Sequence, residues 1–456
     1  MLSAADNELM CRVGPDTPMG KFMREYWIPA LMPEEVPVPD GPPVRLRLLN
    51  ENLIAFRNTS GQVGIIQNAC PHRGASLFFG RNEEDGLRCV YHGWKFDVSG
   101  ACVDMPSEPA ESNFKNKVRT RAYPCIERNG VIWTYMGPRD VPPPLPDLLP
   151  NLHPECRVGK SMRECNFMQA LEGDIDTIHF GFLHAGHVRP EDTAPRTPDY
   201  YAVKVRNAEL KVIDHEVGAT YGAYRPAEED SYYWRISNFM LPFYTQNPTL
   251  LIGRKTMGNA WVPIDDDHVM VWAFNAPTPD GDKPGIGGLQ PNQRRNGSDE
   301  RLAMQMYGAS DVRGFLPETT DWLGRFRPAQ NLSNDYAVNR EAQAQGLIYS
   351  GIPNGANPQD GAMQETMGPI YDRTREHLGT TDAMVIRTRR KLLDCVRAHH
   401  DAGVTPPGVD KPELYRMRSG GLLAAPGVDA LELTKEIIFG RSLTIEGEEP
   451  AIPQTV

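Results

Sequence analysis

The feature of this sequence that most constrains its fold is a pair of short segments between residues 70 and 94, each holding one cysteine and one histidine. The segments are Cys70-Pro-His72-Arg-Gly74 and, fourteen residues later, Cys89-Val-Tyr-His92-Gly93-Trp94. Each supplies one thiolate and one imidazole, and each ends in a glycine that permits a tight turn without a Cβ clash. A chain with this pattern is expected to fold two loops around one metal centre.

Two thiolates and two imidazoles are the ligand set of a Rieske [2Fe–2S] centre, in which two histidines replace two cysteines on one iron. We therefore expect Cys70 and Cys89 to hold one iron and His72 and His92 to hold the other. The alternatives are a Cys₂His₂ zinc site and unrelated buried residues. A zinc finger usually brings both cysteines in one half and both histidines on a helix, whereas here each half has one of each.

The two loops resemble those of Rieske proteins in general. Rieske proteins of respiratory complexes add two cysteines that join the loops by a disulfide. Ala75 and Tyr91 hold those places here, so we expect loops without a disulfide, as suits an oxygenase component.

Composition narrows the class further. The chain has 456 residues, a net charge of −11 and eight cysteines, which allows two or three domains and makes non-specific nucleic-acid binding unlikely. We expect no membrane span, because there is no apolar run of about 18 residues, and the start lacks the order of a signal peptide. Cysteines without a clustered framework favour a reducing, cytoplasmic location with the other six thiols free. These six are Cys11, Cys102, Cys125, Cys156, Cys165 and Cys395.

The first third of the chain predicts a short helical lead over residues 1–24 and then a β-rich domain over 25–141 that carries the cluster. Short alternating runs separated by turns predict its strands. They are Val44–Leu49, Leu53–Phe56, Val63–Ile66, Gly93–Asp97 and Val131–Tyr135. Prolines at 142, 143, 144 and 146 exclude helix and central strand, so residues 142–155 are predicted to be a joint between domains.

Residues 156–456 predict a second domain that mixes strands with one long helix. The expected strands are Tyr201–Val205, Leu210–Ile213, Tyr232–Ile236, Ala260–Val262 and Val269–Phe274. The helix is expected from Thr381 to His400, with Asp382 as its cap and Gly403 just past its end. Residues 276–300 are predicted to form a loop or lid. The fold class is therefore α+β, with a β-rich Rieske domain followed by a helix packed on an antiparallel sheet.

A second metal motif lies near the start of that domain. Polar residues step by 3, 3, 4 and 3 along one predicted helix face; they are Asn166, Gln169, Glu172, Asp176 and His179. His184 lies five residues beyond His179, about 140° around an ideal helix. The two rings would converge only if the helix broke, for which Gly181 is a candidate. Beside a one-electron cluster, a histidine pair favours the 2-His-1-carboxylate site of a non-haem Fe(II) oxygenase.

Taken together, the motifs resemble the α subunit of Rieske non-haem iron ring-hydroxylating oxygenases, in the phthalate 4,5-dioxygenase-like branch. The resemblance rests on both metal motifs, on Glu172-Gly-Asp-Ile-Asp176, and on runs at Cys11–Gly20 and Gln364–Gly379. It implies a helix-grip catalytic domain, a Rieske cluster and a mononuclear Fe(II). It also implies O₂, a small aromatic substrate, and electrons from NADH through a separate flavin and iron–sulfur reductase.

The resemblance also supplies two further residues. It places the third iron ligand at Asp360, just ahead of the Gln364 run, where a helix is expected to begin; Asp335, Asp372 and Asp382 fit less well, and a plain helix cap is the alternative role. Asp176 lies three residues before His179 and is expected to orient its ring. The resemblance suggests that Asp176 also accepts a hydrogen bond from His92 of a neighbouring subunit, within a head-to-tail homotrimer or stacked trimers.

The reaction itself stays open at this stage. The preferred substrate is an aromatic carboxylate, for which Arg206, Arg235 and Arg254 are candidate anchors, although each could be an ordinary ion-pair residue. The alternatives are a monooxygenase that O-dealkylates an aryl ether and, from another class, a Rieske electron carrier without catalysis. A carrier would need only the first 140 residues or so, which argues against it.

Overall fold

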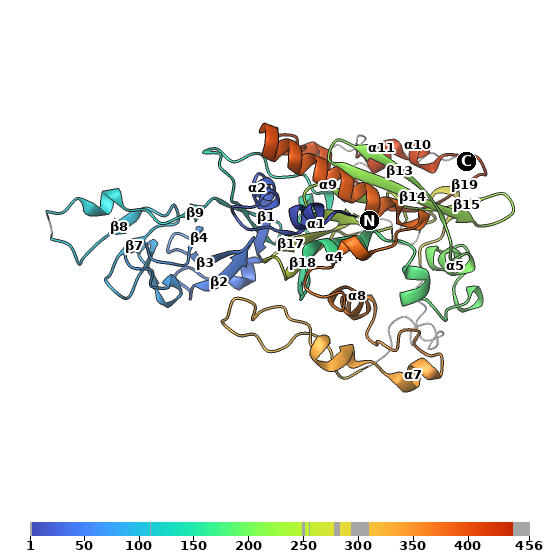
Figure 1. Ribbon diagram of the computed structural model, residues 1–456, viewed down its shortest axis with the longest axis horizontal. Coiled ribbons are helices and arrows are strands. Elements are labelled where there is room, and N and C mark those ends of the chain that lie inside the picture. Colours follow the sequence, from blue (N-terminus) through green and yellow to red (C-terminus); the bar gives the residue numbers. More distant parts are fainter. Residues whose placement is uncertain are drawn as a thin grey trace.

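The computed structural model shows an elongated molecule with a β-rich part at one end and a larger α+β part at the other (Figure 1). It describes residues 2–109, 111–248, 251–254, 256–277, 283–292 and 310–440. Among these residues, none of the helices has the length and hydropathy that crossing a bilayer requires.

Two small antiparallel sheets build the end that carries the cluster loops. One contains β2 (Val44–Leu48), β3 (Glu51–Arg57), β4 (Val63–Gln67) and β9 (Ala122–Tyr123). The other contains β5 (Arg81–Glu83), β6 (Gly86–Arg88), β7 (Lys95–Phe96) and β8 (Cys102–Asp104). A core of its own lies between them and includes Phe56, Leu87 and Phe96. Most predicted strands are confirmed, but β7 is shorter than predicted because Gly93 and Trp94 belong to the cluster loop.

A third sheet connects this end to the rest of the chain. It contains β1 (Trp27–Leu31), β11 (Val131–Tyr135) and β10 (Cys125–Arg128). Its buried residues belong to the large core of the second part, and the Trp133 and Phe274 rings stack with centroids 6.3 Å apart. The proline-rich residues 142–148 have no helix or strand, and α3 (Leu149–Leu152) follows them. The predicted domain limits at 24, 141 and 155 stay predictions.

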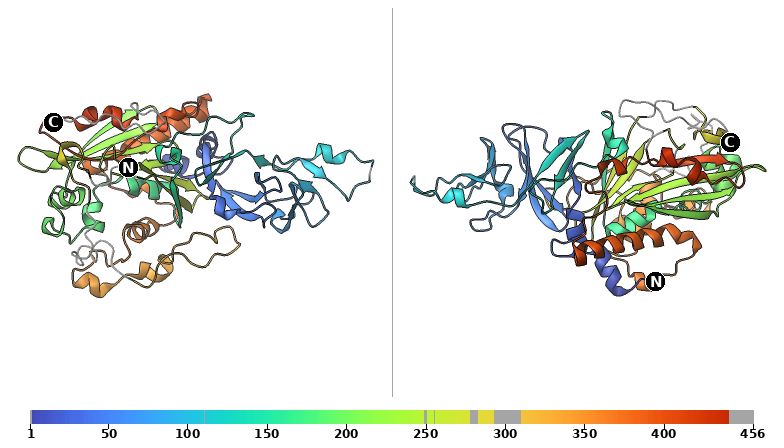
Figure 2. Two further views of the ribbon diagram at one scale, coloured as in Figure 1. Left: turned by 180° about the vertical axis from the view of Figure 1, so that it is seen from behind. Right: turned by 90° about the horizontal axis from the view of Figure 1, so that it is seen from above.

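An eight-stranded antiparallel sheet forms the second part. Its order is β12 (Arg157–Arg163), β18 (Val269–Asn275), β17 (Met257–Pro263), β16 (Tyr244–Gln246), β15 (Tyr232–Met240), β14 (Gly218–Pro226) and β13 (Glu209–His215), with β19 (Gly420–Ala424) also paired to β15. The sheet is antiparallel throughout and carries the long helix α9 (Ala383–Ala402) against β13 and β14, as Figure 2 shows. The predicted α+β fold class is confirmed.

Helix α9 matches its prediction closely. Its buried stripe includes Val385, Leu392, Leu393 and Val396, and Gly403 closes it with φ 63°. Asp382 occupies the cap position, but its carboxylate accepts from the Gly379 N–H instead of a helix N–H. The two helices of the N-terminal lead, α1 (Ala4–Cys11) and α2 (Pro18–Arg24), both pack against α9 (Figure 1).

One predicted strand is wrong, and several observed strands, among them β12, β14 and β19, had no counterpart in the prediction. Residues 201–205 lie mostly in helix α5 (Pro198–Lys204), which Thr197 caps by accepting from the Tyr200 N–H. The short apolar run there could not distinguish strand from helix, and the Thr-Pro start favours the helix. Strands β14 and β19 are rich in glycine and alanine, which weakens the strand signal. Most of the predicted loop at 276–300 lies outside the described residues.

The last third of the chain adds short helices on both sides of the sheet. They are α7 (Arg340–Ala344), α8 (Ala356–Glu365), α10 (Ala430–Leu433) and α11 (Lys435–Ile438). In Figure 1, α7 and α8 lie below the sheet and α10 and α11 lie above it. Ahead of α7, residues 310–330 run back along the cluster-bearing part (Figure 1). There Arg45 donates to the Thr320 carbonyl, and its guanidinium lies 3.7 Å from the centre of the Phe78 ring.

Candidate metal centres

The two cysteine loops share one backbone design. In the first, the Gly74 N–H donates to the Cys70 carbonyl over 2.8 Å and the Cys70 N–H donates to the Ala75 carbonyl over 2.8 Å. In the second, the Gly93 N–H donates to the Cys89 carbonyl over 2.9 Å and the Cys89 N–H donates to the Trp94 carbonyl over 2.8 Å. The two glycines have φ of 77° and 79°. These left-handed positions explain why the motif needs glycine.

The loops face each other with their predicted ligands inside. The rings of His72 and His92 have centroids 4.4 Å apart, and Trp94 stacks on His72 at 4.4 Å. The Nδ1 atom of His92 is buried and makes no hydrogen bond among the described residues. Partial burial and the charges of His72 and Arg73 lower the pKa of His92, which favours the neutral ring that binds metal.

The thiols are consistent with a metal centre. Cys70 and Cys89 are both buried, and burial raises the pKa of Cys70 to about 11. A thiol there keeps its proton unless a cation replaces it, as iron does in a cluster. All eight cysteines are free of disulfides, so the expectation of loops without a disulfide is confirmed. Two thiolates and an orphaned imidazole nitrogen on facing loops fit a [2Fe–2S] cluster.

The second motif is not one continuous helix. Helix α4 spans Phe167–Ile175 and ends at Asp176, which has extended backbone angles (φ −81°, ψ 113°). The predicted helix through His179 with a break at Gly181 is therefore wrong, and the break comes five residues earlier. The polar stripe is not solvated either, because Asn166 and Gln169 are buried. Asn166 donates to the carbonyls of Cys11 and Asp266, and Gln169 donates to the Gly368 carbonyl.

A turn of π-helix brings the two histidines together. Residues Phe180–His184 have this conformation, and the Ala185 N–H donates to the Phe180 carbonyl five residues back. A π turn is wider than an α turn, so residues five apart lie nearly above one another. The Nε2 atoms of His179 and His184 are 3.1 Å apart. No sequence rule for an ordinary helix could supply this geometry.

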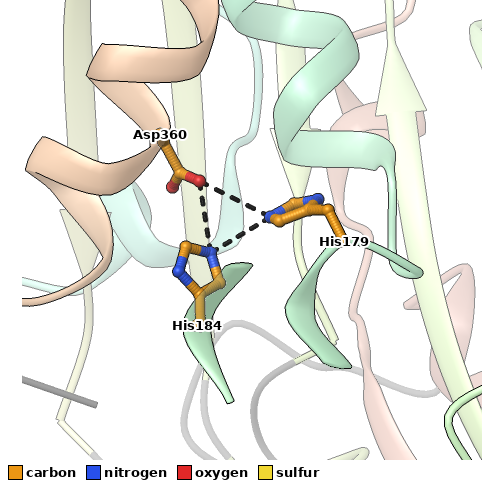
Figure 3. A group of neighbouring side chains, drawn as sticks. All are labelled: His179, His184 and Asp360. Atoms are coloured by element: carbon orange, nitrogen blue, oxygen red, sulfur yellow. Dashed lines mark hydrogen bonds and ion pairs between the residues drawn. The ribbon is translucent and has the colours of Figure 1, made fainter. Parts of the chain in front are cut away.

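Asp360 completes the group from helix α8 (Figure 3). Its Oδ1 lies 3.5 Å from His179 Nε2 and 3.2 Å from His184 Nε2. Three ligands around one ion with bonds of about 2.1 Å are expected about 3 Å apart. Among the described residues, this is the one group of three or more potential ligands with donor atoms within 4.8 Å. The donor set fits a mononuclear iron with open positions.

The start of α8 differs from its prediction. The helix begins at Ala356, not at Asp360, and Pro358 lies within its first turn, where no backbone N–H is needed. Asp360 therefore lies in the second turn and is not a helix cap. Burial would raise the pKa of Asp360, but contact with His184 and the charge of Arg163 outweigh burial, so this pKa lies below its usual value and the group is a carboxylate.

Asp176 faces the other side of His179. Its Oδ2 lies 3.6 Å from His179 Nδ1, and its Oδ1 accepts from the Ile178 N–H over 2.8 Å. Burial opposes ionisation of this group, but the contact with His179 outweighs burial and lowers the pKa of Asp176. The Asp176 side chain keeps 33% of its surface exposed, which leaves room for a further partner.

Glu172, on the same helix as the motif, has a structural role. Its carboxylate accepts from Arg373 over 3.0 Å and from Arg389 over 2.7 Å. Arg373 is fully buried and also donates to Asn7 Oδ1 in α1 over 3.1 Å. This network joins the helix before the iron site to the N-terminal lead and to α9.

Sequence reasoning missed the partner of His184. Gln359 is fully buried, and its Oε1 lies 2.7 Å from His184 Nδ1. The two residues are 175 positions apart, so no local pattern could pair them. The one feature of the sequence that could have pointed to Gln359 was its position directly before Asp360.

The three candidate anchors differ sharply in surroundings. Arg206 donates to the carbonyls of Ala185 and Val188 and so supports the loop after the motif. Arg254 donates to the Pro284 carbonyl. Arg235 is 4% exposed, its Nε donates to Thr177 Oγ1 over 3.0 Å, and no ion pair involves it among the described residues. Of the three, only Arg235 is both buried and in contact with the segment at residues 176–184, called the iron loop below.

A loop-bound cluster site and a separate carboxylate–histidine triad define an iron-dependent oxygenase component. The comparisons agree with this class. Residues 26–124 match the Rieske [2Fe-2S] domain and residues 312–417 match a LigXa C-terminal-like domain. The chain is 44% identical to the 3-chlorobenzoate-3,4-dioxygenase oxygenase subunit of Comamonas testosteroni, over 94% of this chain and 97% of that protein.

Two further comparisons extend this likeness. The phthalate 4,5-dioxygenase oxygenase subunit of Pseudomonas putida is 37% identical over 87% of each chain. A crystal structure of dicamba monooxygenase bound to 3,6-dichlorosalicylic acid is 18% identical, with a TM-score of 0.53 over 84% of this chain and 99% of that one. The latter likeness concerns the fold.

The chain belongs to the Rieske non-haem iron aromatic ring-hydroxylating oxygenases, as an α (oxygenase) subunit. It is an oxygenase component of a multicomponent system acting on aromatic compounds, and its cofactors are a Rieske [2Fe–2S] cluster and a mononuclear iron.

Proposed function

We propose that this protein uses O₂ and electrons derived from NADH to hydroxylate an aromatic carboxylate. In this proposal Cys70 and Cys89 hold one iron of the cluster and His72 and His92 hold the other. His179, His184 and Asp360 hold the mononuclear iron. The cluster supplies single electrons and the mononuclear iron activates O₂ when both are bound.

The observation that carries the substrate class is a pair of buried cations on the sheet beside the iron loop. Arg235 on β15 and Arg225 on β14 are 4% and 3% exposed. The Nε and Nη2 atoms of Arg225 have no hydrogen-bond partner among the described residues, and neither arginine forms an ion pair there. Burial and the charge of Arg235 lower the pKa of Arg225 to about 10. The partly buried carboxylate of Asp199 is within range of the charge of Arg235 but forms no ion pair with it. Two buried cations without a carboxylate in direct contact favour an anionic ligand.

Arg235 is held in a position to orient such a ligand. Its Nε is occupied by Thr177 Oγ1, two residues before His179, which leaves the two terminal nitrogens for a bidentate carboxylate contact. The guanidinium lies 5.0 Å from the centre of the Phe180 ring, the residue after His179. The anchor on β15 therefore contacts the iron loop, the short segment that carries His179 and His184. A carboxylate on Arg235 would present the ring of the substrate at a fixed position relative to that loop.

Substrate discrimination by Arg235→Gln tests this proposal. The oxygenase is combined with an NADH-dependent flavin iron–sulfur reductase and given benzoates, phthalates, their methyl esters and an aryl ether. We expect the variant to lose roughly 10- to 100-fold in kcat/KM for the acids, because a charged hydrogen-bond pair is lost. The esters should change little.

Arg254→Gln is the matched control, and its kcat/KM should equal that of the wild type. Equal losses for acids and esters would contradict the anchor role of Arg235. Turnover of the aryl ether alone, with release of the alkyl group, would assign the protein to O-dealkylation instead. Incorporation of two atoms or one atom from ¹⁸O₂ separates dihydroxylation from monooxygenation.

A further inference from the structure

We propose that Gln359 is a positioning residue that fixes the ring orientation and the tautomer of His184. This inference rests on the proposed role of His184 as an iron ligand. It concerns an uncharged residue that no ligand motif of this kind would select.

The contacts of Gln359 use both ends of its amide. Its Oε1 lies 2.7 Å from His184 Nδ1, and its Nε2 donates to the Ile352 carbonyl over 3.0 Å. The side chain is fully buried, so water does not compete for either contact. The Ile352 carbonyl can only accept, which requires the NH₂ end of the amide to face it and the oxygen to face the histidine.

This orientation determines where His184 carries its proton. An amide oxygen can only accept, so the proton of the neutral ring is on Nδ1. The Nε2 atom then has a free lone pair, and it is the atom that faces Asp360 Oδ1 at 3.2 Å and His179 Nε2 at 3.1 Å. Gln359 thus keeps the lone pair of His184 directed at the proposed iron site.

Helix α8 holds His184 from both sides. Asp360 faces its Nε2 and Gln359 faces its Nδ1, and these two residues are consecutive in the helix. Neighbouring residues of an α-helix point about 100° apart. One helix can therefore place a ligand and the support of a second ligand around the same imidazole. A shift of α8 would change both contacts together.

The two histidines consequently have partners of different charge. His179 faces the carboxylate of Asp176 at 3.6 Å, and that side chain is one-third exposed. His184 faces a neutral, fully buried amide at 2.7 Å. An imidazole that is hydrogen-bonded to a carboxylate donates its electron pair to a metal more strongly than one that is hydrogen-bonded to an amide. The proposed iron would therefore have one histidine whose partner is accessible from the surface and one whose partner is fully buried.

Gln359 also joins His184 to a tight turn that Gln330 holds from the other side. Gly351 and Gly355 have φ of 74° and 96° and shape this turn. Gln330 is buried, and its Nε2 donates to the Pro353 carbonyl, one residue beyond Ile352, over 3.2 Å. Among the described residues, Gln330 hydrogen-bonds to Tyr336, Pro353 and Asn354 and to neither histidine. It is therefore a control for the turn alone.

The test compares Gln359→Leu, Gln359→Glu and Gln330→Leu in the full-length protein. The rate of iron loss to a chelator and the EPR spectrum of the NO complex of the ferrous site are measured at constant Rieske absorbance. Gln359→Leu should weaken iron binding roughly 10- to 100-fold and alter the NO spectrum. Gln359→Glu keeps an acceptor and should stay within a few-fold of the wild type. Gln330→Leu should match the wild type in both measurements.

Wild-type iron retention and an unchanged NO spectrum in Gln359→Leu would overturn the inference. So would equal losses in Gln330→Leu and Gln359→Leu, because the effect would then come from the turn. If Gln359→Leu does not fold, iron loss from a folded Gln359→Glu as fast as from His184→Ala would overturn it. Iron retention in His184→Ala would instead contradict the proposed ligand role on which this inference rests.

Discussion

The cluster loops and the iron triad differ in how far apart their proposed ligands lie in the sequence. All four proposed cluster ligands lie between residues 70 and 92, on two loops whose hydrogen bonds repeat each other. The proposed iron ligands come from His179 and the π turn at 180–184 that follows it, and from a helix that begins at residue 356. The first site is largely a local structure, whereas the second exists only once the whole second part has folded. The two sites should therefore respond differently to substitution.

The largest expected effect is an independent loss of either site. His179→Ala, His184→Ala and Asp360→Ala should each abolish product formation and lower the iron content from about three to about two per chain, with the Rieske spectrum intact. His92→Ala should do the reverse and bleach the Rieske spectrum while sparing the mononuclear iron. Metal analysis and EPR check both results. An active, iron-replete Asp360→Ala would place the third ligand elsewhere.

A smaller effect is expected for a residue that affects electron transfer between the two sites. Asp176→Asn should keep both metal centres but slow electron transfer between them by orders of magnitude, because the exposed carboxylate beside His179 is lost. The measurement is a single-turnover reaction of pre-reduced protein with substrate and O₂. Cluster oxidation at the wild-type rate would leave Asp176 only the role of orienting His179.

The smallest effect concerns the contact between the two parts. Lys160 on β12 is buried against Glu35 at 2.6 Å, with Trp272 and Phe326 around it. Burial lowers the pKa of Lys160 to about 8, and the charge of Glu35 only partly opposes this. Since the folded state holds the proton less tightly than the unfolded state, the unfolding free energy contributed by Lys160 should rise between about pH 8 and pH 10.5, by about 1–3 kcal/mol.

The corresponding measurement is the difference in thermal midpoint between wild type and Lys160→Met across that pH range. The difference should change in favour of the wild type as the pH rises. A constant difference would mean that Lys160 stays charged in the folded protein throughout. Lys411, an exposed lysine paired with Glu216, provides the control Lys411→Met.

These contrasts also explain what the sequence could predict. The cluster loops were predictable because their ligands and their left-handed glycines are close in sequence. His179 and His184 were recognised as a pair, but the break at Asp176 and the π turn were not, since both depend on contacts of the surrounding fold. Asp360 came from family resemblance alone. Gln359 could not be found, because nothing local distinguishes it from any other helical glutamine.

Secondary structure was likewise predictable where the signal is local and unpredictable where it depends on the surrounding fold. Val63–Gln67 and Val131–Tyr135 alternate or bury strongly apolar residues and were assigned correctly. Helix α5 was mistaken for a strand because five residues carry too little periodicity, and β14 was missed because burial by neighbouring strands, not its own side chains, makes it a strand. Tertiary context decides such segments.

The network around Glu172 has a consequence for the order in which the protein is made. Asn7 leaves the ribosome among the first residues, but its partner Arg373 is synthesised 366 positions later. At common translation rates this delay is roughly 20–70 s. The cluster loops and their own small core are complete long before then, so the cluster can be inserted into a nascent chain. The helix that precedes the iron motif gains its partners Arg373 and Arg389 only after this delay, so we expect the mononuclear iron site to be completed later than the cluster site.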